Sequence, residues 1–441
     1  MKKLLPLIIA SVLGSASFNV LATDLAEVFE QAKANDPELL EAKAKRDAAI
    51  AQIGVARAAL LPSFNFEASH QRSGASKILR EGYSSGFQVA FSQSIYDRKN
   101  WIGLDKAEMS VQLQNVLFEA EQQKTMFKTS QAYFDVLKAQ DSLEFSRLEK
   151  VAISRQLEQV KQRFDVGLSA ITDVNETQAD YDTVLAREIQ AENEVINKLE
   201  VLHEITGIQF KDLDKLDTAK FSASKPTVSL PALVKTATER NVGILAARIG
   251  KDLAKFDIET ATAGHLPTLR LDGGYQQTLS KQPRSILNIE IPASKEKQKN
   301  LAATLKFVVP IYQGGAISAN VEVQKANHIA ASQLLEQAYR ETIKNIRAVY
   351  NNINAAIGLI KAYEQSVVSA NSALEATEAG FEVGTSTVVD VLNATQRLYD
   401  ANRRLSEARY SYILNQLQLK QVIGELNEGD LKDINAGLTK G

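Results

Sequence analysis

The 441-residue chain has no cysteine, which excludes disulfides, thiolate metal sites and the acylated cysteine of a bacterial lipoprotein. Four histidines are present, and they share no spacing typical of a metal site: His70, His203, His265 and His328. No phosphate-binding loop or dinucleotide fingerprint occurs, and the formal net charge of −2 gives no indication of a nucleic-acid partner. We therefore expect a protein that is not an enzyme, with no catalytic residues, metal or cofactor.

Long apolar runs are also missing from most of the chain. Lys2 and Lys3 precede a short apolar stretch at residues 4–13, and Val20-Leu21-Ala22 fits a signal-peptidase site. We predict that residues 1–22 are a signal peptide, with an uncleaved anchor as the alternative. After residue 22 no stretch approaches the roughly 18–20 apolar residues of a membrane helix, so the chain could enter a membrane only as a β-barrel.

An internal duplication is the strongest feature that the sequence does contain. The segment FDVGLSAITDV at Phe164–Val174 recurs as FEVGTSTVVDV at Phe381–Val391, 217 residues later. In each copy a glycine, Gly167 or Gly384, follows a long helical pattern, and glycine enters the left-handed region without steric cost. These turns either simply end the helices of a coiled-coil hairpin or form the functional site of the molecule.

Long helices are predicted on both sides of each turn. Apolar residues within 100–164 and 316–381 recur at alternating spacings of four and three, which is the heptad pattern of coiled helices. At 1.5 Å per residue, each of these helices would be about 100 Å long. Return helices are predicted at residues 170–206 and 388–423.

Four segments of about ten residues alternate apolar and polar side chains, as tilted membrane strands do. They are residues 62–72, 85–96, 267–277 and 301–312, with a loop inside each pair and the second loop running to Asn300. Tyr96 and Trp101 lie at the exit of the first pair, where an aromatic belt is expected. The two pairs predict two hairpins of membrane strands.

These elements predict an α+β membrane protein made of two repeats, at residues 23–210 and 230–424. Each repeat has a short helix, a strand pair, a long helix and a return helix; a connector at 211–229 and a loose tail or edge strand at 425–441 complete the chain. Four strands cannot close, and an open edge in lipid leaves backbone groups unpaired. Several chains must therefore share the barrel, and two, three or four would give eight, twelve or sixteen strands. The charged helices must project into water.

Several collinear strings resemble the TolC family of outer-membrane channels. They include ALLP at 59–62, QSIYD at 93–97, QRFDVGLSAITDV at 162–174, GHLPTL at 264–269 and PIYQGG at 310–315. The resemblance covers about residues 24–438. It implies a homotrimer with a shared 12-stranded β-barrel in the outer membrane and a long coiled α-helical barrel of twelve helices in the periplasm. It also implies two partners: a periplasmic adaptor (membrane fusion) protein and an inner-membrane transporter of the RND, ABC or MFS class.

The same resemblance implies which residues act at the periplasmic tip. The gate positions are Thr172, Asp173, Phe381 and Ser386, the constriction positions are Asp390 and Asn393, and the adaptor-docking positions are Val166, Gly167, Val383 and Gly384. The family has a Tyr where this chain has Phe381, an Arg where it has Ser386, and an Asp where it has Asn393. The link of the family's Arg to Asp173 therefore cannot form here.

Two expectations follow for the tip. We expect a weaker polar lock, with Phe381 packing and helix coiling holding the tip closed. We also expect a ring of Asp390 carboxylates, one from each chain, to favour cations. The alternative role of Asp173 and Asp390 is simple capping of the helices that follow the turns, where acids favour the helix dipole.

The function predicted from these features is a passive exit duct for a tripartite efflux pump or type I secretion system, opened at its tip by the adaptor and transporter. The alternative is a periplasmic coiled-coil adaptor or structural protein without a barrel.

Overall fold

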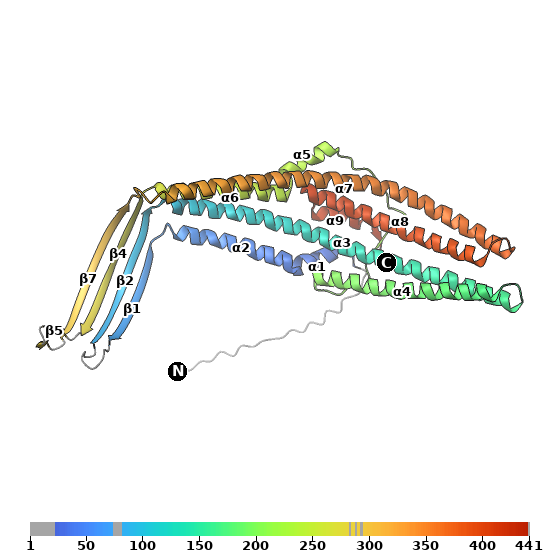
Figure 1. The fold of residues 1–441 in the computed structure, drawn as a ribbon, viewed down its shortest axis with the longest axis horizontal. Coiled ribbons are helices and arrows are strands. Elements are labelled where there is room, and N and C mark those ends of the chain that lie inside the picture. The colour runs from blue at the N-terminus through green and yellow to red at the C-terminus, as the bar shows by residue number, and fades with distance from the viewer. Residues whose placement is uncertain (1–22, 74–81, 282–283, 287–288, 292–293, 440–441) are drawn as a thin grey trace.

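The computed structural model describes residues 23–73, 82–281, 284–286, 289–291 and 294–439. The predicted signal peptide at 1–22 lies outside these residues. A sheet stands at one end of an elongated molecule, and long helices run from it to a tip at the other end (Figure 1). None of the helices in the described ranges is long and apolar enough to cross a membrane.

The helices occur in two matching sets. The first set is α1 (Leu25–Asn35), α2 (Pro37–Ala58), α3 (Arg98–Asp165) and α4 (Ile171–Thr206). The second is α5 (Leu230–Arg240), α6 (Val242–Thr262) with the short turn η1 (Ala263–His265), α7 (Ala316–Glu382) and α8 (Val388–Ile423). Asp36 and Asn241 cap α2 and α6 in the same way, because the side-chain oxygen of each accepts a backbone N–H of the first turn at 3.0 Å.

Four antiparallel strands form the main sheet in the order β1-β2-β4-β7. Their bounds are β1 (Ser63–Ser73), β2 (Gly82–Tyr96), β4 (Thr268–Lys281) and β7 (Lys295–Val308). The order places the first hairpin directly beside the second, and leaves β1 and β7 at the edges of the sheet within one chain.

The second hairpin is longer than its sequence pattern predicted. Residues 278–281 and 295–300, expected in a loop, extend β4 and β7 in an unbroken register from Thr268↔Val308 to Lys281↔Lys295. Lys, Glu and Gln are weak strand formers, and pairing with β4 overrides that preference. At the other end β7 stops at Val308 rather than 312, before Pro310, which has no N–H to donate. Two short strands, β5 (Arg284–Ile286) and β6 (Ile289–Ile291), pair with each other beyond this hairpin.

The connector and the tail meet at mid-length. β3 (Lys215–Leu216) of the connector pairs with β8 (Leu438–Thr439) of the tail. The tail also forms a helix that was not expected, α9 (Glu428–Asn435), capped by Asn427, whose backbone N–H is in turn bonded to Asp430. Asn435 accepts a hydrogen bond from the backbone N–H of Leu25 at 3.1 Å, so the two ends of the described chain are held together.

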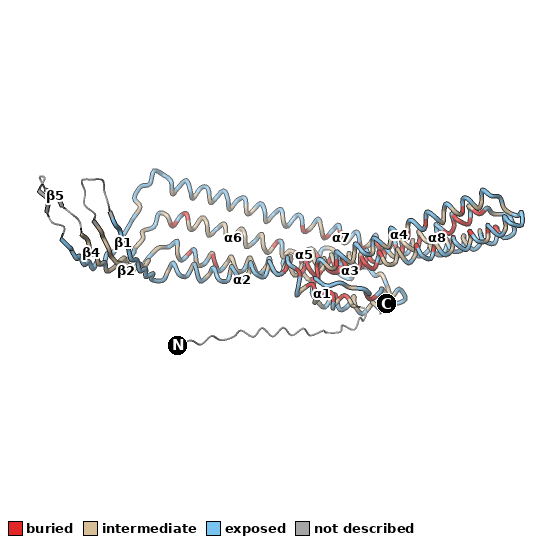
Figure 2. Tube along the Cα trace, turned by 90° about the horizontal axis from the view of Figure 1, so that it is seen from below, coloured by how far each residue is buried: buried red, intermediate tan, exposed pale blue. Residues whose placement is uncertain are grey.

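Buried side chains gather in the middle of the molecule and toward its tip (Figure 2). The larger core lies where α1, α3, α4, α5, α7, α8 and α9 meet, and includes Tyr133, Phe134 and Leu417. A smaller core lies near the tip. Nearer the sheet, α2 and the start of α7 are mostly exposed or half-buried (Figure 2). Within one chain the two helical hairpins (α3–α4 and α7–α8) therefore pack tightly only between mid-length and the tip.

Candidate gate at the helical tip

Both tip turns have the same backbone geometry. Gly167 and Gly384 have φ of 82° and 80°, which only glycine adopts without a steric penalty. In the first turn Gly167 N donates to Phe164 O at 2.9 Å and Leu168 N to Arg163 O at 2.8 Å, the Schellman pattern of a helix end. The second turn repeats it, with Gly384 N bonded to Phe381 O at 3.2 Å and Thr385 N to Gly380 O at 2.8 Å.

The predicted acids Asp173 and Asp390 each cap the helix that follows a turn. Asp173 accepts the backbone N–H of Ala170 at 3.1 Å and the hydroxyl of Ser169 at 2.7 Å. Asp390 accepts the backbone N–H of Thr387 at 2.9 Å and its hydroxyl at 2.7 Å. The Thr387 hydrogen bonds, together with the charge of Arg397, hold the pKa of Asp390 below its ordinary value. The capping role considered from the sequence is therefore present at both acids.

Arg163 links the two hairpins at the tip. This α3 side chain donates from its guanidinium to Phe381 O at 3.0 Å and to Glu382 O at 3.3 Å, both at the end of α7. Its guanidinium carbon also lies 4.5 Å from the centre of the Phe381 ring. A cation at a helix C-terminus is stabilised by the unpaired carbonyls and by the helix dipole, and stacking on an aromatic face adds to this.

Phe381 closes a small apolar core below Arg163. Its ring is 8% exposed and belongs to a cluster contributed by all four tip helices: Ile153, Val160, Val184, Phe381, Val388, Val391 and Leu392. The matching residue of the first copy, Phe164, is 40% exposed. The two copies of the turn are therefore unequal in structure, since the second phenylalanine packs between the hairpins and the first does not.

The other predicted gate residues make few contacts within the chain. Ser386 donates its backbone N–H to Gly380 O at 3.1 Å. Thr172 and Asn393 are exposed and have no side-chain hydrogen bond among the described residues. Asp173 lies in the first turn of α4, and its side-chain hydrogen bonds are to Ser169 and Ala170 of the same hairpin. The structure thus brings Phe381 to the hairpin interface and leaves Thr172, Asp173 and Asn393 outside it.

The four predicted docking positions are on the outer surface of the turns. Val166 is 69% exposed and Val383 is 75% exposed, and they flank Gly167 and Gly384, whose Cα atoms face open space. Leu168 is 76% exposed beside them. Exposed apolar residues at a loop tip are typical of a surface that binds another protein.

Arg163 was missed in the sequence because its partners are backbone carbonyls 218 and 219 residues away. Every residue has a backbone carbonyl, so an acceptor of this kind cannot be recognised from the sequence. The one available signal was the unequal pair Arg163 and Gly380, which occupy the same position in the two copies of the turn.

A buried carboxylate ties the hairpins together above the tip. Glu149 of α3 is 1% exposed and accepts hydrogen bonds from Arg187 of α4 at 2.9 Å and Arg403 of α8 at 3.0 Å. Arg403 also pairs with Asp400. A buried charge needs such partners, because an unpaired one is costly in a low-dielectric interior. Glu149 therefore joins three helices from both hairpins.

A second polar contact between α3 and α8 lies closer to mid-length. Asp141 accepts hydrogen bonds from Ser406 and from the Tyr410 hydroxyl, the latter at 3.0 Å. Burial raises the pKa of Asp141, and it also raises the pKa of Tyr410. The α3–α8 contact is thus polar at Asp141 and Glu149 and apolar at the tip.

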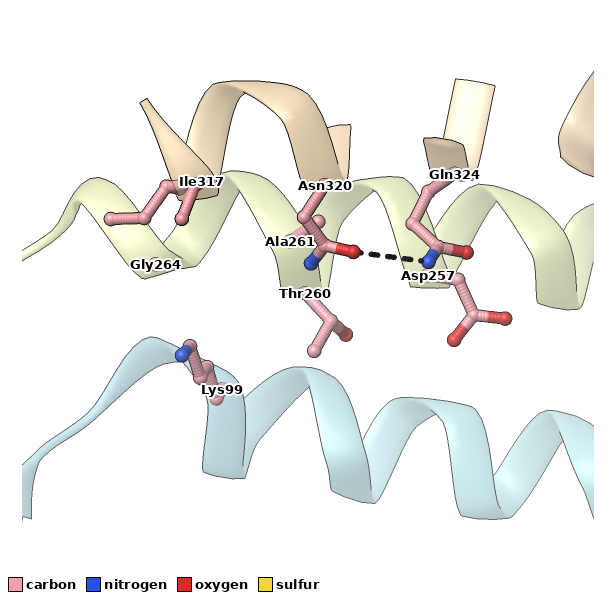
Figure 3. Close-up of a pocket in the computed structure, with 9 residues that line it drawn as sticks. Lys99, Asp257, Thr260, Ala261, Gly264, Ile317, Asn320 and Gln324 are labelled. Atoms are coloured by element: carbon pink, nitrogen blue, oxygen red, sulfur yellow. Dashed lines mark hydrogen bonds between the residues drawn. The ribbon is translucent and has the colours of Figure 1, made fainter. Parts of the chain in front are cut away.

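A separate groove lies at the opposite end of the helices, and Figure 3 shows the side chains that line it. It has a volume of about 320 Å³ and lies between Lys99 of α3, Asp257 and Gly264 of the α6 region, and Asn320 and Gln324 of α7. Gln324 Nε2 donates to Asn320 Oδ1 at 3.4 Å, and Asp257 pairs with Lys106. Nowhere in the described ranges do three His, Asp or Glu side chains gather where they could hold a metal ion.

Paired long helical hairpins attached to a sheet with one apolar face are the architecture of outer-membrane export channels. The chain belongs to the outer membrane efflux protein family, which it matches over residues 28–208 and 233–425. It is 49% identical to outer membrane protein TolC of Vibrio cholerae serotype O1, over 99% of both chains. It is 26% identical to the proteases secretion protein PrtF of Dickeya chrysanthemi, over 96% of this chain and 93% of that protein.

The fold also matches solved structures. The outer membrane channel CmeC of Campylobacter jejuni superposes with a TM-score of 0.75 and 18% identity, over 94% of this chain and 89% of that one. These matches confirm the predicted family and a TolC-like, mostly helical fold. The protein is located in the outer membrane and serves as an exit duct for efflux or secretion.

Proposed function

We propose that three copies of the chain share one 12-stranded barrel in the outer membrane and one tunnel of helices in the periplasm. The observation that carries this proposal is the open sheet: four strands end in two edges, β1 and β7. Edges in lipid would leave backbone groups unpaired at several kcal/mol each. Pairing β1 of one copy with β7 of the next satisfies both edges and closes a ring.

The two faces of the sheet suit a water-filled barrel. On the outward face the rings of Phe64 and Phe91 lie 5.1 Å apart, and Phe87 and Tyr275 lie 5.9 Å apart. On the inward face the Ser92 hydroxyl donates to Asp272 at 2.8 Å and accepts from Arg270 at 3.0 Å. An apolar outside and a polar inside are the pattern of an outer-membrane pore.

The helical end supplies the gate of the duct. In the trimer the six tip turns surround one opening. Arg163 and Phe381 hold the two hairpins of each chain together. Thr172, Asp173 and Ser386 belong to the gate at the surface of the turns, and Asp390 and Asn393 face the constriction. Three Asp390 carboxylates around one axis attract cations and repel anions.

The partners act on the outer surface of the same tip. A periplasmic adaptor docks on the exposed residues Val166, Gly167, Val383 and Gly384, and an inner-membrane transporter of the RND, ABC or MFS class delivers the cargo. The duct itself is passive, so the transporter selects what passes. Opening requires the second hairpin of each chain to swing away from the first, which breaks the Arg163 contacts.

Fractionation and electrophoresis test the assembly. We expect the protein in the outer-membrane fraction as a trimer that resists detergent and dissociates on heating. The alternative function, a periplasmic coiled-coil adaptor without a barrel, predicts a soluble monomer released with the periplasm. That result would contradict the proposed duct.

A further inference from the structure

The outward face of the sheet changes character along its length. On β7 the residues at odd positions share one face, and from the helix end these are Phe307, Leu305, Ala303 and Leu301, followed by Lys299, Lys297 and Lys295. Side chains alternate between faces along a strand, and the register with β4 has no bulge, so all seven point the same way. The apolar band therefore continues directly into a row of three lysines.

On the neighbouring strand β4 the change comes later, since Gln277 and Leu279 lie opposite Lys299 and Lys297. Opposite the apolar residues of β7 lie Leu269, Leu271 and Tyr275 of β4, and opposite Lys295 lies Lys281. The four lysines 281, 295, 297 and 299 are named here the lysine rim. All three lysines of β7 are exposed, and within the described chain none forms an ion pair with a carboxylate. The residues between them, Glu296 and Gln298, are on the opposite face.

The lysine rim is at the end of the sheet away from the helices (Figure 1). The helix-side end carries Tyr96, Trp101 and Tyr312 instead, all of which are exposed. Aromatic rings suit either membrane interface. The apolar outward residues of β4 run from Leu269 to Leu279, about 25 Å at the usual strand rise and tilt, which matches the apolar band of an outer-membrane barrel. The rim then lies at the edge of this band, with Lys297 opposite Leu279, and the long lysine side chains extend to the level of the lipid headgroups.

We propose that the lysine rim binds phosphate-bearing headgroups of lipids in the outward leaflet. This inference rests on the proposed function, because the barrel places the rim at that leaflet. Lysine binds phosphate as a point charge, and its long stem can lie along the apolar band while the ammonium reaches the interface. The row spans about 13 Å from Lys295 to Lys299, enough for each chain to hold a phosphorylated headgroup at more than one point.

A different role is possible for lysines on an edge strand. Edge lysines prevent strands of separate molecules from pairing, and their removal then promotes aggregation. Such lysines need only be charged and exposed. The lysine rim differs from such edge lysines in its position. Its members continue an apolar row on one face of β7, whereas Glu296 lies on the opposite face of the same strand.

Lipid retention by the purified trimer tests the proposal. The probe is lipid A with its two phosphates, added to the detergent-solubilised protein and compared with the same lipid after removal of the phosphates. We compare the wild type with Lys295→Gln/Lys297→Gln/Lys299→Gln, with the triple Arg variant at these positions, and with Lys325→Gln/Lys344→Gln/Lys361→Gln on α7. The α7 variant is the matched control, because it also loses three positive charges but at positions outside the sheet. Bound lipid per trimer is measured by native mass spectrometry.

The wild type, the triple Arg variant and the α7 variant should retain phosphorylated lipid A equally. Each lysine near an anionic lipid surface contributes roughly fivefold, so the triple Gln variant should bind on the order of 100-fold more weakly. Dephosphorylated lipid should bind weakly to all, and millimolar inorganic phosphate should not displace lipid A. Equal retention by the triple Gln variant, or loss of solubility without loss of lipid, would overturn the proposal.

Conductance of the same variants in planar bilayers separates this inference from the proposed function. A triple Gln variant that conducts as the wild type does but retains lipid equally overturns the lipid site alone. A wild type that neither forms trimers nor conducts overturns the barrel, and the lysine rim with it.

Discussion

Removal of the Arg163 side chain should open the tip. In Arg163→Ala each chain loses two charged hydrogen bonds to the end of α7, at 3.0 and 3.3 Å, and the stacking of the guanidinium on Phe381. The site is half-buried, so solvent weakens each contact. A cation at a helix C-terminus contributes about 0.3–1 kcal/mol, and stacking at an exposed site about 0.5–1 kcal/mol. The closed arrangement should therefore lose about 1–2 kcal/mol per chain.

The expected readout is single-channel conductance in planar bilayers. A loss of 1.4 kcal/mol changes an equilibrium about tenfold, so a concerted opening of three chains should shift the open population by roughly a hundredfold or more. Lys161→Ala is the matched control, because Lys161 is an exposed neighbour on α3 with no ion pair in the described chain. Arg163→Lys should be intermediate, since it keeps the charge and loses the planar fork. Conductance of Arg163→Ala equal to that of Lys161→Ala would refute the role of Arg163.

Three further substitutions test the remaining tip contacts. Asp173→Ala should change conductance less than Arg163→Ala does, because Asp173 caps α4 within its own hairpin; a larger effect would reveal a polar lock between hairpins. Thr387→Ala should raise the pKa of Asp390, because the Thr387 hydroxyl hydrogen bond that lowers it is lost. Cation preference, present above that pKa, should then disappear at a higher pH as the solution is acidified, and an unchanged midpoint would contradict the contact. Glu149→Gln leaves Arg187 without its carboxylate partner and Arg403 with Asp400 alone, and should destabilise the hairpins by about 3 kcal/mol in thermal unfolding; an unchanged Tm would show that the buried pairs contribute nothing net.

Heptad spacing and the position of Gly167 and Gly384 indicated the long helices and their turns, because both features act locally. Helix periodicity depends on which residues face a core, and the turn depends on a left-handed residue. Each leaves a regular mark in the sequence. The capping of α4 and α8 by Asp173 and Asp390 was readable for the same reason, since the partner of each acid is three residues away.

Features that depend on pairing between distant segments were harder to predict. Residues 295–299 read Lys, Glu, Lys, Gln and Lys, and a run that is polar on both faces does not resemble a membrane strand. Only its register with β4 places it in the sheet. Helix α9 is too short to show a helical period, although Asn427 followed three residues later by Asp430 is a capping pattern that could have revealed it.

The tip shows the limit of transferring residue roles by position. Loss of the family's Tyr and Arg at Phe381 and Ser386 suggested a weaker closure. Phe381 packs in an apolar core, which is the packing expected from the sequence, and Arg163, which the sequence did not indicate, stacks on its ring. The contacts between the hairpins come from Arg163 of the first hairpin, and their acceptors are main-chain carbonyls of the second rather than side chains.

The mass of the conducting particle tests the shared barrel most directly. Protein extracted from the outer membrane in mild detergent, and shown to conduct in a planar bilayer, should have a native mass of three processed chains. Three chains supply twelve strands and leave a lumen, whereas two would supply eight and fill the interior with side chains. A conducting particle that contains one chain or two would contradict the trimeric duct.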